Sequence, residues 1–225
     1  MKLSLVSAAI WMMLAGIVAA QDQGPVLSVT GQGDVAVAPD MAVISLGVVH
    51  VDKTAGDAMA KVSADATALI AVLSEQGIEA RDIQTSQLNV NPVWSSYDST
   101  DRKITGFEAR NAVTVRVRNL DGLGGVLDQV LEVGANTFNG LQFQLQDPSA
   151  AEAKARAAAV QDAMAKATQL SEAAGASLGT ILSLSESGQS PRPEMFAAAR
   201  SADLPIAAGE LVVTARVMMS YSLAP

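Results

Sequence analysis

The chain has 225 residues, with 23 acidic and 15 basic side chains and a formal net charge of −8 at pH 7. An acidic chain without a lysine or arginine cluster repels phosphate backbones and anionic lipid, which argues against nucleic-acid and membrane-surface binding. The chain has no cysteine, so disulfides, thiol chemistry and a lipid-modified cysteine are excluded. With four Phe, two Trp and two Tyr, its core must be aliphatic, and few rings are available to stack on bases or sugars.

Residues 1–20 have the composition of a secretory signal peptide. They carry one lysine, continue as an apolar run and end in the small residues Ala19 and Ala20 before the polar Gln21. An uncleaved membrane anchor is the alternative, but the run is shorter than the about 20 apolar residues that a span needs. We therefore expect an exported protein in which residues 21–225 form a single domain, with no membrane span after cleavage.

The mature chain begins with two predicted strands. Residues 27–37 alternate between apolar and polar side chains, and residues 41–51 are apolar on both faces, as in a central strand. We expect the two to pair as a hairpin across Pro39. Gly31 and Gly33 fall on the buried face of the first strand, where they mark a bulge or a place where a helix packs directly on the backbone.

A helix and two strands follow. Thr54 begins the helix and Gly77 ends it. Its expected buried stripe consists of Met59, Val62, Ala66, Leu69, Ile70 and Leu73. Residues 83–94 then predict a strand that Pro92 confines to a sheet edge or a bulge, and residues 104–118 alternate cleanly between apolar and charged side chains.

The second half predicts two more helices. Residues 120–131 form one of them, and residues 141–145 form the next strand. Asp147, Pro148 and a Ser149–Glu152 capping box place the start of a long helix that ends at Gly175. Its expected buried stripe is Ala153, Ala157, Val160, Met164, Ala167 and Ala174.

Two strands complete the chain, at residues 181–187 and 211–223, with a segment between them that has no periodicity. This segment, residues 188–209, contains three prolines and is predicted to be a flexible loop, either functional or disordered. The order β-β-α-β-β-α-β-α-β-β predicts an α+β fold, with about three helices on one side of a shared mixed or antiparallel sheet. Gly77 and Gly175 each end a helix six residues before an isoleucine that begins a strand, so the chain has a possible pseudo-repeat of two halves.

The residues that carry chemistry are sparse. His50 is the single histidine, and a zinc site or a catalytic triad needs further partners, so we expect a structural or solvent-edge histidine. The run 122–125, Gly-Leu-Gly-Gly, lacks the lysine of a phosphate-binding loop. Asp98 and Asp101 lack the spacing of a calcium loop. We expect no catalytic residues, no metal and no cofactor.

Methionine and phenylalanine provide two further candidates. Sacrificial oxidation of exposed methionine would depend on Met195, Met218 or Met219, with core filling as the preferred interpretation. Met195 and Phe196 form an apolar pair in the predicted loop, where solvent is expected. Such a pair either inserts into a neighbouring subunit or folds back onto its own domain, and it is our candidate self-association site.

Three separated segments carry a family resemblance. They are V-L-S-V-T-G-Q-G-D-V-A-V-A-P-D from Val26, G-F-E-A-R-N-A-V-T-V-R-V from Gly106, and the helix and strand that begin at Asp147. Together they resemble the SIMPL-domain family of the YggE-like periplasmic kind, over Val26 to Tyr221, with the loop at 188–209 as the departure. The resemblance implies an exported α+β protein linked to oxidative-stress defence, with some relatives being immunogenic periplasmic or outer-membrane antigens that form ring-like homo-oligomers. No established catalytic residue of the family can be carried over.

The leading functional hypothesis is therefore a non-enzymatic periplasmic protein that associates with itself and is linked to oxidative-stress defence. The alternative is a periplasmic binding module for a small apolar or peptide ligand, which predicts an aliphatic pocket between helices and sheet. A third hypothesis is an enzyme with a carboxylate-only site, which the absence of any paired-acid motif disfavours.

Overall fold

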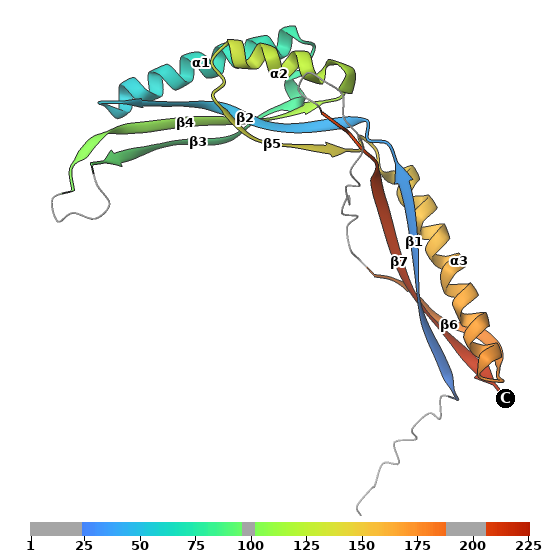
Figure 1. Cartoon of the computed structure of the whole chain (residues 1–225). Coiled ribbons are helices and arrows are strands. Elements are labelled where there is room, and N and C mark those ends of the chain that lie inside the picture. Colours follow the sequence, from blue (N-terminus) through green and yellow to red (C-terminus); the bar gives the residue numbers. More distant parts are fainter. Residues whose placement is uncertain (1–23, 96–101, 188–205) are drawn as a thin grey trace, which may run out of the picture.

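The computed structural model describes residues 24–95, 102–187 and 206–225 (Figure 1). Its helices and strands follow the predicted order and confirm the α+β class. They are β1 Val26–Val37, β2 Met41–Asp52, α1 Ala55–Glu75, β3 Ile83–Trp94, β4 Ile104–Val117, α2 Leu123–Glu132, β5 Thr137–Gln144, α3 Ser149–Ala173, β6 Ser177–Glu186 and β7 Leu211–Ala224.

The strands form two antiparallel sheets rather than one shared sheet. The four-stranded sheet has the order β3-β4-β2-β5, and the three-stranded sheet has the order β1-β7-β6. Helices α1 and α2 cover one face of the larger sheet and α3 covers one face of the smaller sheet (Figure 1). The described residues therefore form an arch, with the three helices on the outer side and the sheet faces that no described helix covers on the inner side.

The predicted hairpin between the first two strands is wrong. β1 pairs with β7 over its whole length, from Val26 opposite Ser222 to Val37 opposite Leu211, whereas β2 lies between β4 and β5. The connection from β1 to β2 does not form a hairpin turn, because Pro39 is buried and Asp40 is hydrogen-bonded at the end of β5 in the larger sheet. The Asp40 N–H donates to the Gln144 carbonyl at 3.2 Å, and the Asp40 Oδ1 accepts from the Gln146 N–H at 2.7 Å.

Each sheet and its helices form one body of the molecule. The two bodies do not correspond to two sequential halves of the chain, contrary to the possible pseudo-repeat. The smaller sheet takes its strands from both ends of the chain, and the larger one is contiguous from β2 to β5. The local part of the predicted repeat holds, since Gly77 and Gly175 end α1 and α3 with φ of 81° and 69°. The strands that follow, β3 and β6, lie in different sheets.

The main core lies between the four-stranded sheet and its two helices. Leu69 and Leu73 of α1 and Val126 and Val130 of α2 are buried there against β2 and β4. Thr54 caps α1 as predicted, with its Oγ1 accepting from the Asp57 N–H. The predicted stripe needs a correction at its margins: Ala58 is fully buried, whereas Met59 is half-buried and Ile70 is exposed. This core contains the largest cluster of buried apolar residues in the described ranges.

Helix α3 lies almost directly on the backbone of β1. Its buried stripe is Ala151, Ala155, Ala159, Ala163, Ala167 and Ser171. A Cβ atom added at Gly31 would lie 2.0 Å from the Ala159 carbonyl oxygen, and one added at Gly33 would lie 2.2 Å from that of Ala155. The close-packing role predicted for the two glycines is therefore confirmed. The predicted stripe of α3 is confirmed only at Ala167, because alanine occupies both faces and the apolar pattern does not distinguish them; Met164 is half exposed.

Polar contacts fix the ends and one side of α3. Asp147 accepts from the Ser149 N–H at 2.9 Å, but Ser149 lies inside the helix, so the predicted capping box does not form. Hydrogen bonds from Ser149 hold the pKa of the Asp147 carboxyl below its usual value. The predicted Asp162–Lys166 ion pair is present at 2.7 Å. It also bonds β1, since Asp162 accepts from the Gln32 N–H and Lys166 donates to the Thr30 carbonyl.

Replacing Gly31 by alanine is expected to destabilise the protein by about 2 kcal/mol or more, because the new methyl group has to push α3 away from β1. The matched control is Gly124→Ala in α2, where a Cβ meets nothing within 4 Å. There the substitution is expected to stabilise by about 0.5–1 kcal/mol, through helix propensity. Urea unfolding followed by circular dichroism measures both. Equal stability of Gly31→Ala and the wild type would contradict the close contact.

Candidate functional site

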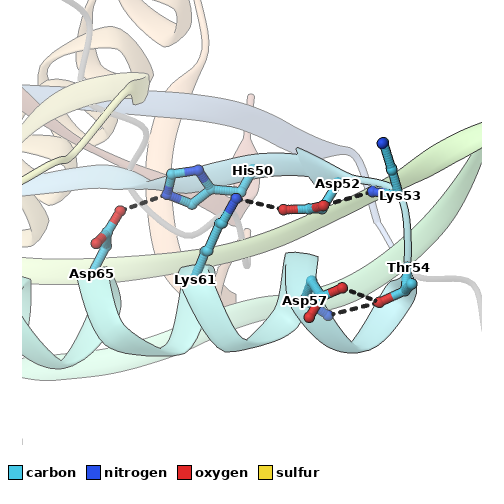
Figure 2. Close-up of polar contacts among 7 residues, drawn as sticks. All are labelled: His50, Asp52, Lys53, Thr54, Asp57, Lys61 and Asp65. Carbon is cyan, nitrogen blue, oxygen red and sulfur yellow. Dashed lines mark hydrogen bonds and ion pairs between the residues drawn. The ribbon is translucent and has the colours of Figure 1, made fainter.

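The single histidine lies in a polar cluster where β2 ends and α1 begins. The Nε2 of His50 lies 2.5 Å from the Oδ2 of Asp65, and both side chains are about one third exposed (Figure 2). A hydrolytic triad would need a hydroxyl next to the imidazole. The hydroxyl drawn in the cluster, that of Thr54, donates to Asp57 at 2.7 Å and accepts from the Asp57 N–H, so it caps α1. The pair therefore links β2 to α1.

The other contacts in the cluster also attach α1 to the end of β2. Lys61 of α1 donates to the Oδ2 of Asp52 at 2.5 Å, and the Lys53 N–H donates to the other carboxylate oxygen at 2.7 Å. These hydrogen bonds lower the pKa of Asp52, and the contact with Asp52 raises the pKa of Lys61. Among the residues that the structure describes, no group of three histidine or acidic side chains is placed to hold a metal ion.

The other candidates from the sequence are separated in space or fall outside the described ranges. Residues 122–125 begin α2, where no side chain caps the helix. Met218 is half exposed and Met219 is buried. Asp98, Asp101, Met195 and Phe196 lie outside the described residues, so the predicted self-association pair stays a prediction.

The buried carboxylate of Asp82 is an electrostatic feature that the sequence did not reveal. Asp82 is 4% exposed, and Arg118 holds it through two parallel hydrogen bonds, Nε to Oδ2 at 2.7 Å and Nη2 to Oδ1 at 2.8 Å. These hydrogen bonds lower the pKa of Asp82 against the opposing effect of its burial. The Nη1 of Arg118 also donates to Gln146 at 3.0 Å, so one guanidinium ties the start of β3 to the segment after β5.

An apolar surface follows the free edge of the smaller sheet. We define the β6 edge surface as Ile181, Leu182 and Leu184, which lie on both faces of this edge strand, together with Met164 of α3; these side chains are 50–54% exposed. Ser177–Ser185 contains no charged residue and no proline. Met164 lies on the same side of α3 as Arg156, whose guanidinium reaches Glu186 at the end of β6 at 2.8 Å. An uncharged strand at a sheet edge is a template for pairing with another chain.

The pairing of β6 with β7 is interrupted twice, on either side of Ile181. At the first interruption the Ser222 Oγ accepts from the Thr180 N–H at 3.1 Å and replaces a ladder bond. The outer side of β6 has no strand partner within the described part of the chain. The sequence predicted this strand but not its position at an edge, which depends on the order of the sheet.

An apolar pocket opens at an edge of the larger sheet. It has a volume of about 220 Å³ and lies between α2 and β5. Its walls include Leu127, Val130, Leu131, Phe138, Leu141 and Ile206. Leu131 and Phe138 are 58% and 54% exposed, respectively. No polar surface lines the pocket.

These features define a class of protein: a two-sheet α+β protein whose described surface carries exposed apolar side chains at two sheet edges. The family model described as SIMPL, protein of unknown function (DUF541), matches residues 27–221. The chain belongs to this family, as the resemblance predicted.

Curated relatives agree with this assignment. The chain is 36% identical over 197 residues to the 26 kDa periplasmic immunogenic protein of Brucella melitensis, covering 82% of this chain and 79% of that protein. It is 29% identical over 212 residues to the uncharacterized protein YggE of Edwardsiella ictaluri, covering 90% and 89% of the two chains. YggE of Escherichia coli K12 is 29% identical over 189 residues, covering 82% and 76%. In the described ranges, no helix is both long and apolar enough to cross a membrane.

The Asp82–Arg118 pair predicts a pH dependence. Because folding lowers the pKa of Asp82 from 3.8, its contribution to stability is fully present above that value and is lost as the pH falls through the folded pKa. Asp82→Asn is expected to cost about 2 kcal/mol at pH 7, and the difference from the wild type should shrink in acid. Urea midpoints at pH 7, 5 and 3 measure this, with Glu172→Gln at an exposed carboxylate as control. A cost that is the same at all three pH values would contradict the role of the charge.

Proposed function

We propose that this protein acts in the periplasm by associating with copies of itself, without catalysing a reaction, and contributes there to defence against oxidative stress. The signal-like residues 1–20 and the word periplasmic in the name of the Brucella relative support the location. The observation that carries the proposal is the β6 edge surface.

The edge surface supports self-association because natural proteins normally protect such strands. Charged side chains, prolines or covering segments usually prevent edge-to-edge pairing. In β6 the central residues are uncharged, and apolar side chains lie on a strand whose main-chain edge has no described partner. A second copy of the chain is always present at matching concentration, and pairing along β6 would bury these side chains. Met195 and Phe196 remain a further candidate contact for the same assembly.

The link to oxidative stress is supported by the family resemblance and by two exposed thioethers. Met164 and Met218 are 50% and 51% exposed. An exposed methionine can be oxidised to the sulfoxide and so consume an oxidant. Because Met164 is part of the β6 edge surface, oxidation there would make an association surface polar. Outer-membrane association is a finer part of this proposal, which cell fractionation tests.

A second candidate function is ligand binding. A binding module predicts an aliphatic pocket between helices and sheet, and the α2–β5 pocket has this position and lining. A cavity with apolar walls that is open at a sheet edge supports a binding module for a small apolar or peptide ligand.

Leu182→Lys is expected to convert the assembled protein into a monomer, because a charge in the middle of the edge opposes strand pairing. The matched control is Leu170→Lys, which places the same charge at an equally exposed leucine. Leu170 lies one turn after Lys166, on the flank of α3 that contacts β1. Light scattering at micromolar concentration measures the mass, and circular dichroism checks the fold. A monomeric wild type would contradict self-association, and an assembled Leu182→Lys protein would contradict the β6 edge as its interface.

The role in stress defence is tested in a deletion strain. We expect such a strain to be more sensitive to peroxide, and the wild-type chain and Leu170→Lys to restore resistance. Leu182→Lys should fail to restore it if assembly is required. Full rescue by Leu182→Lys, with a monomeric product in the periplasm, would separate stress defence from self-association. Equal survival of the deletion and parent strains would reject the stress role.

A further inference from the structure

The size and lining of the α2–β5 pocket restrict what it can hold. Its volume of about 220 Å³ exceeds the about 150 Å³ of an engineered apolar cavity that admits benzene. One leucine or phenylalanine side chain fits such a space. Sites for small molecules usually include a few polar groups that orient the ligand. Because no polar surface lines this pocket, its walls can bury an apolar group but offer no hydrogen bonds that would orient a ligand.

Hydrogen-bonding groups that could orient a ligand lie immediately outside the pocket, on the main chain of β5. β5 ends the four-stranded sheet and pairs with β2 on one side. Within the described ranges, residues 137–143 make no main-chain hydrogen bond to any segment other than β2. Among the described residues, the outer N–H and C=O groups of β5 therefore have no partner, as the addition of a strand requires. Such addition provides main-chain hydrogen bonds, while pockets for alternate side chains provide specificity.

The β5 side chains that line the pocket lie on the face of the sheet that α2 covers. Phe138 and Leu141 pair with Leu46 and Ile44 of β2, whose side chains are buried under the helices. Because cross-strand partners point to the same face, both β5 side chains point toward α2. A strand added to β5 would thus lie beside it in the sheet, with every second side chain directed to the face that carries α2 and the pocket.

The start of β5 is held rigidly. The side-chain amide of Asn136 donates to the Val49 carbonyl at 2.8 Å and accepts from the Val49 N–H at 2.8 Å. This residue therefore attaches the segment before β5 to β2 in the manner of a ladder pair. An edge that is fixed before binding loses less conformational freedom when a ligand adds to it.

The charges around the groove select a cationic ligand. Helix α2 carries Asp128 and Glu132 and no basic residue, and β5 carries no charge. Helical spacing places Asp128 and Glu132 on the stripe next to Leu131, on the side that leads away from the core and toward the edge. A basic peptide is favoured by these carboxylates, and an acidic one is repelled.

We propose that the groove between α2 and β5 binds an extended, positively charged peptide segment of another protein, which adds as a strand to β5 and inserts one large apolar side chain into the pocket. This inference rests on the second candidate function and is independent of pairing along β6.

Labelled heptapeptides of the sequence Lys-Thr-Val-Xaa-Val-Thr-Lys test the proposal, where Xaa is Leu, Phe, Ala or Asp. Fluorescence anisotropy with the full mature chain should show saturable binding of the Leu and Phe peptides. Replacing the anchor with Ala or Asp should weaken binding about tenfold or more. Exchanging both lysines for glutamates should also weaken it. No saturable binding of the Leu or Phe peptide up to millimolar concentration would overturn the proposal.

Protein variants locate the site. Phe138→Asp and Leu131→Asp change half-exposed side chains at the pocket, so the fold should persist, and each is expected to weaken the Leu peptide about tenfold or more. Leu170→Asp is the matched control and should bind normally. Methylating alternate peptide nitrogens should abolish binding in one register and spare it in the other, as strand addition requires. Unchanged binding by Phe138→Asp, or equal tolerance of both methylation registers, would overturn the proposal.

Two further outcomes separate this inference from the functions proposed above. If indole shifts the nuclear magnetic resonance signals of Leu131 and Phe138 and no peptide binds, the pocket serves a small apolar ligand, and only the peptide inference fails. If the Leu peptide binds Leu182→Lys but not the wild type, a second copy covers the groove in the assembly, which also overturns an external peptide partner.

Discussion

The contact between the α3 backbone and the glycines of β1 determines the architecture. Without side chains at Gly31 and Gly33, the helix approaches the strand until its alanines touch the main chain. Larger residues at either position would require a greater distance between α3 and β1 and different side chains to fill the space between them. The contact holds β1 in the smaller sheet beside β7 and away from β2, which follows it directly in the chain. The arch of two bodies is a consequence of this separation.

The larger body is stabilised by a different kind of packing. Branched side chains such as Ile44, Leu69 and Val130 interdigitate there between sheet and helices, and each buries more area than an alanine. The two bodies meet through Leu145, which packs against both cores, through Leu211 of β7, which is buried in the larger core, and through the contacts of Asp40 and Arg118 with Gln146. The join between the sheets therefore combines apolar and polar contacts.

The sequence predicted the elements well and their partners poorly. Strand and helix periods, caps and helix-ending glycines are local signals, so the order of ten elements and the roles of Thr54, Gly77 and Gly175 could be derived. Strand pairing is non-local: Val26 lies opposite Ser222, and nothing near Pro39 indicates this. The buried stripe of α3 was missed because alanine is nearly uniform around the helix. Only the position of the two glycines opposite it selects the face.

The candidate surfaces could not be foreseen from the sequence. An uncharged run from Ser177 to Ser185 was visible in the sequence, but whether such a strand is central or at an edge depends on the sheet order. The pocket depends on the distance between α2 and the last strand of its sheet. The Asp82–Arg118 pair joins residues that are 36 positions apart, neither of which has a distinctive sequence context. Membership of the SIMPL family adds relatives without assigning them a reaction.

The pairing of β1 with β7 has a consequence for the order in which the molecule forms. The four-stranded body consists of consecutive segments and can collapse as soon as they have emerged, whereas the smaller sheet has to wait for the last residues of the chain. Until then β1 and β6 both lack the strand that lies between them. A nascent chain therefore carries two unpaired strands until β7 has been made, and these are the segments on which a chaperone would act.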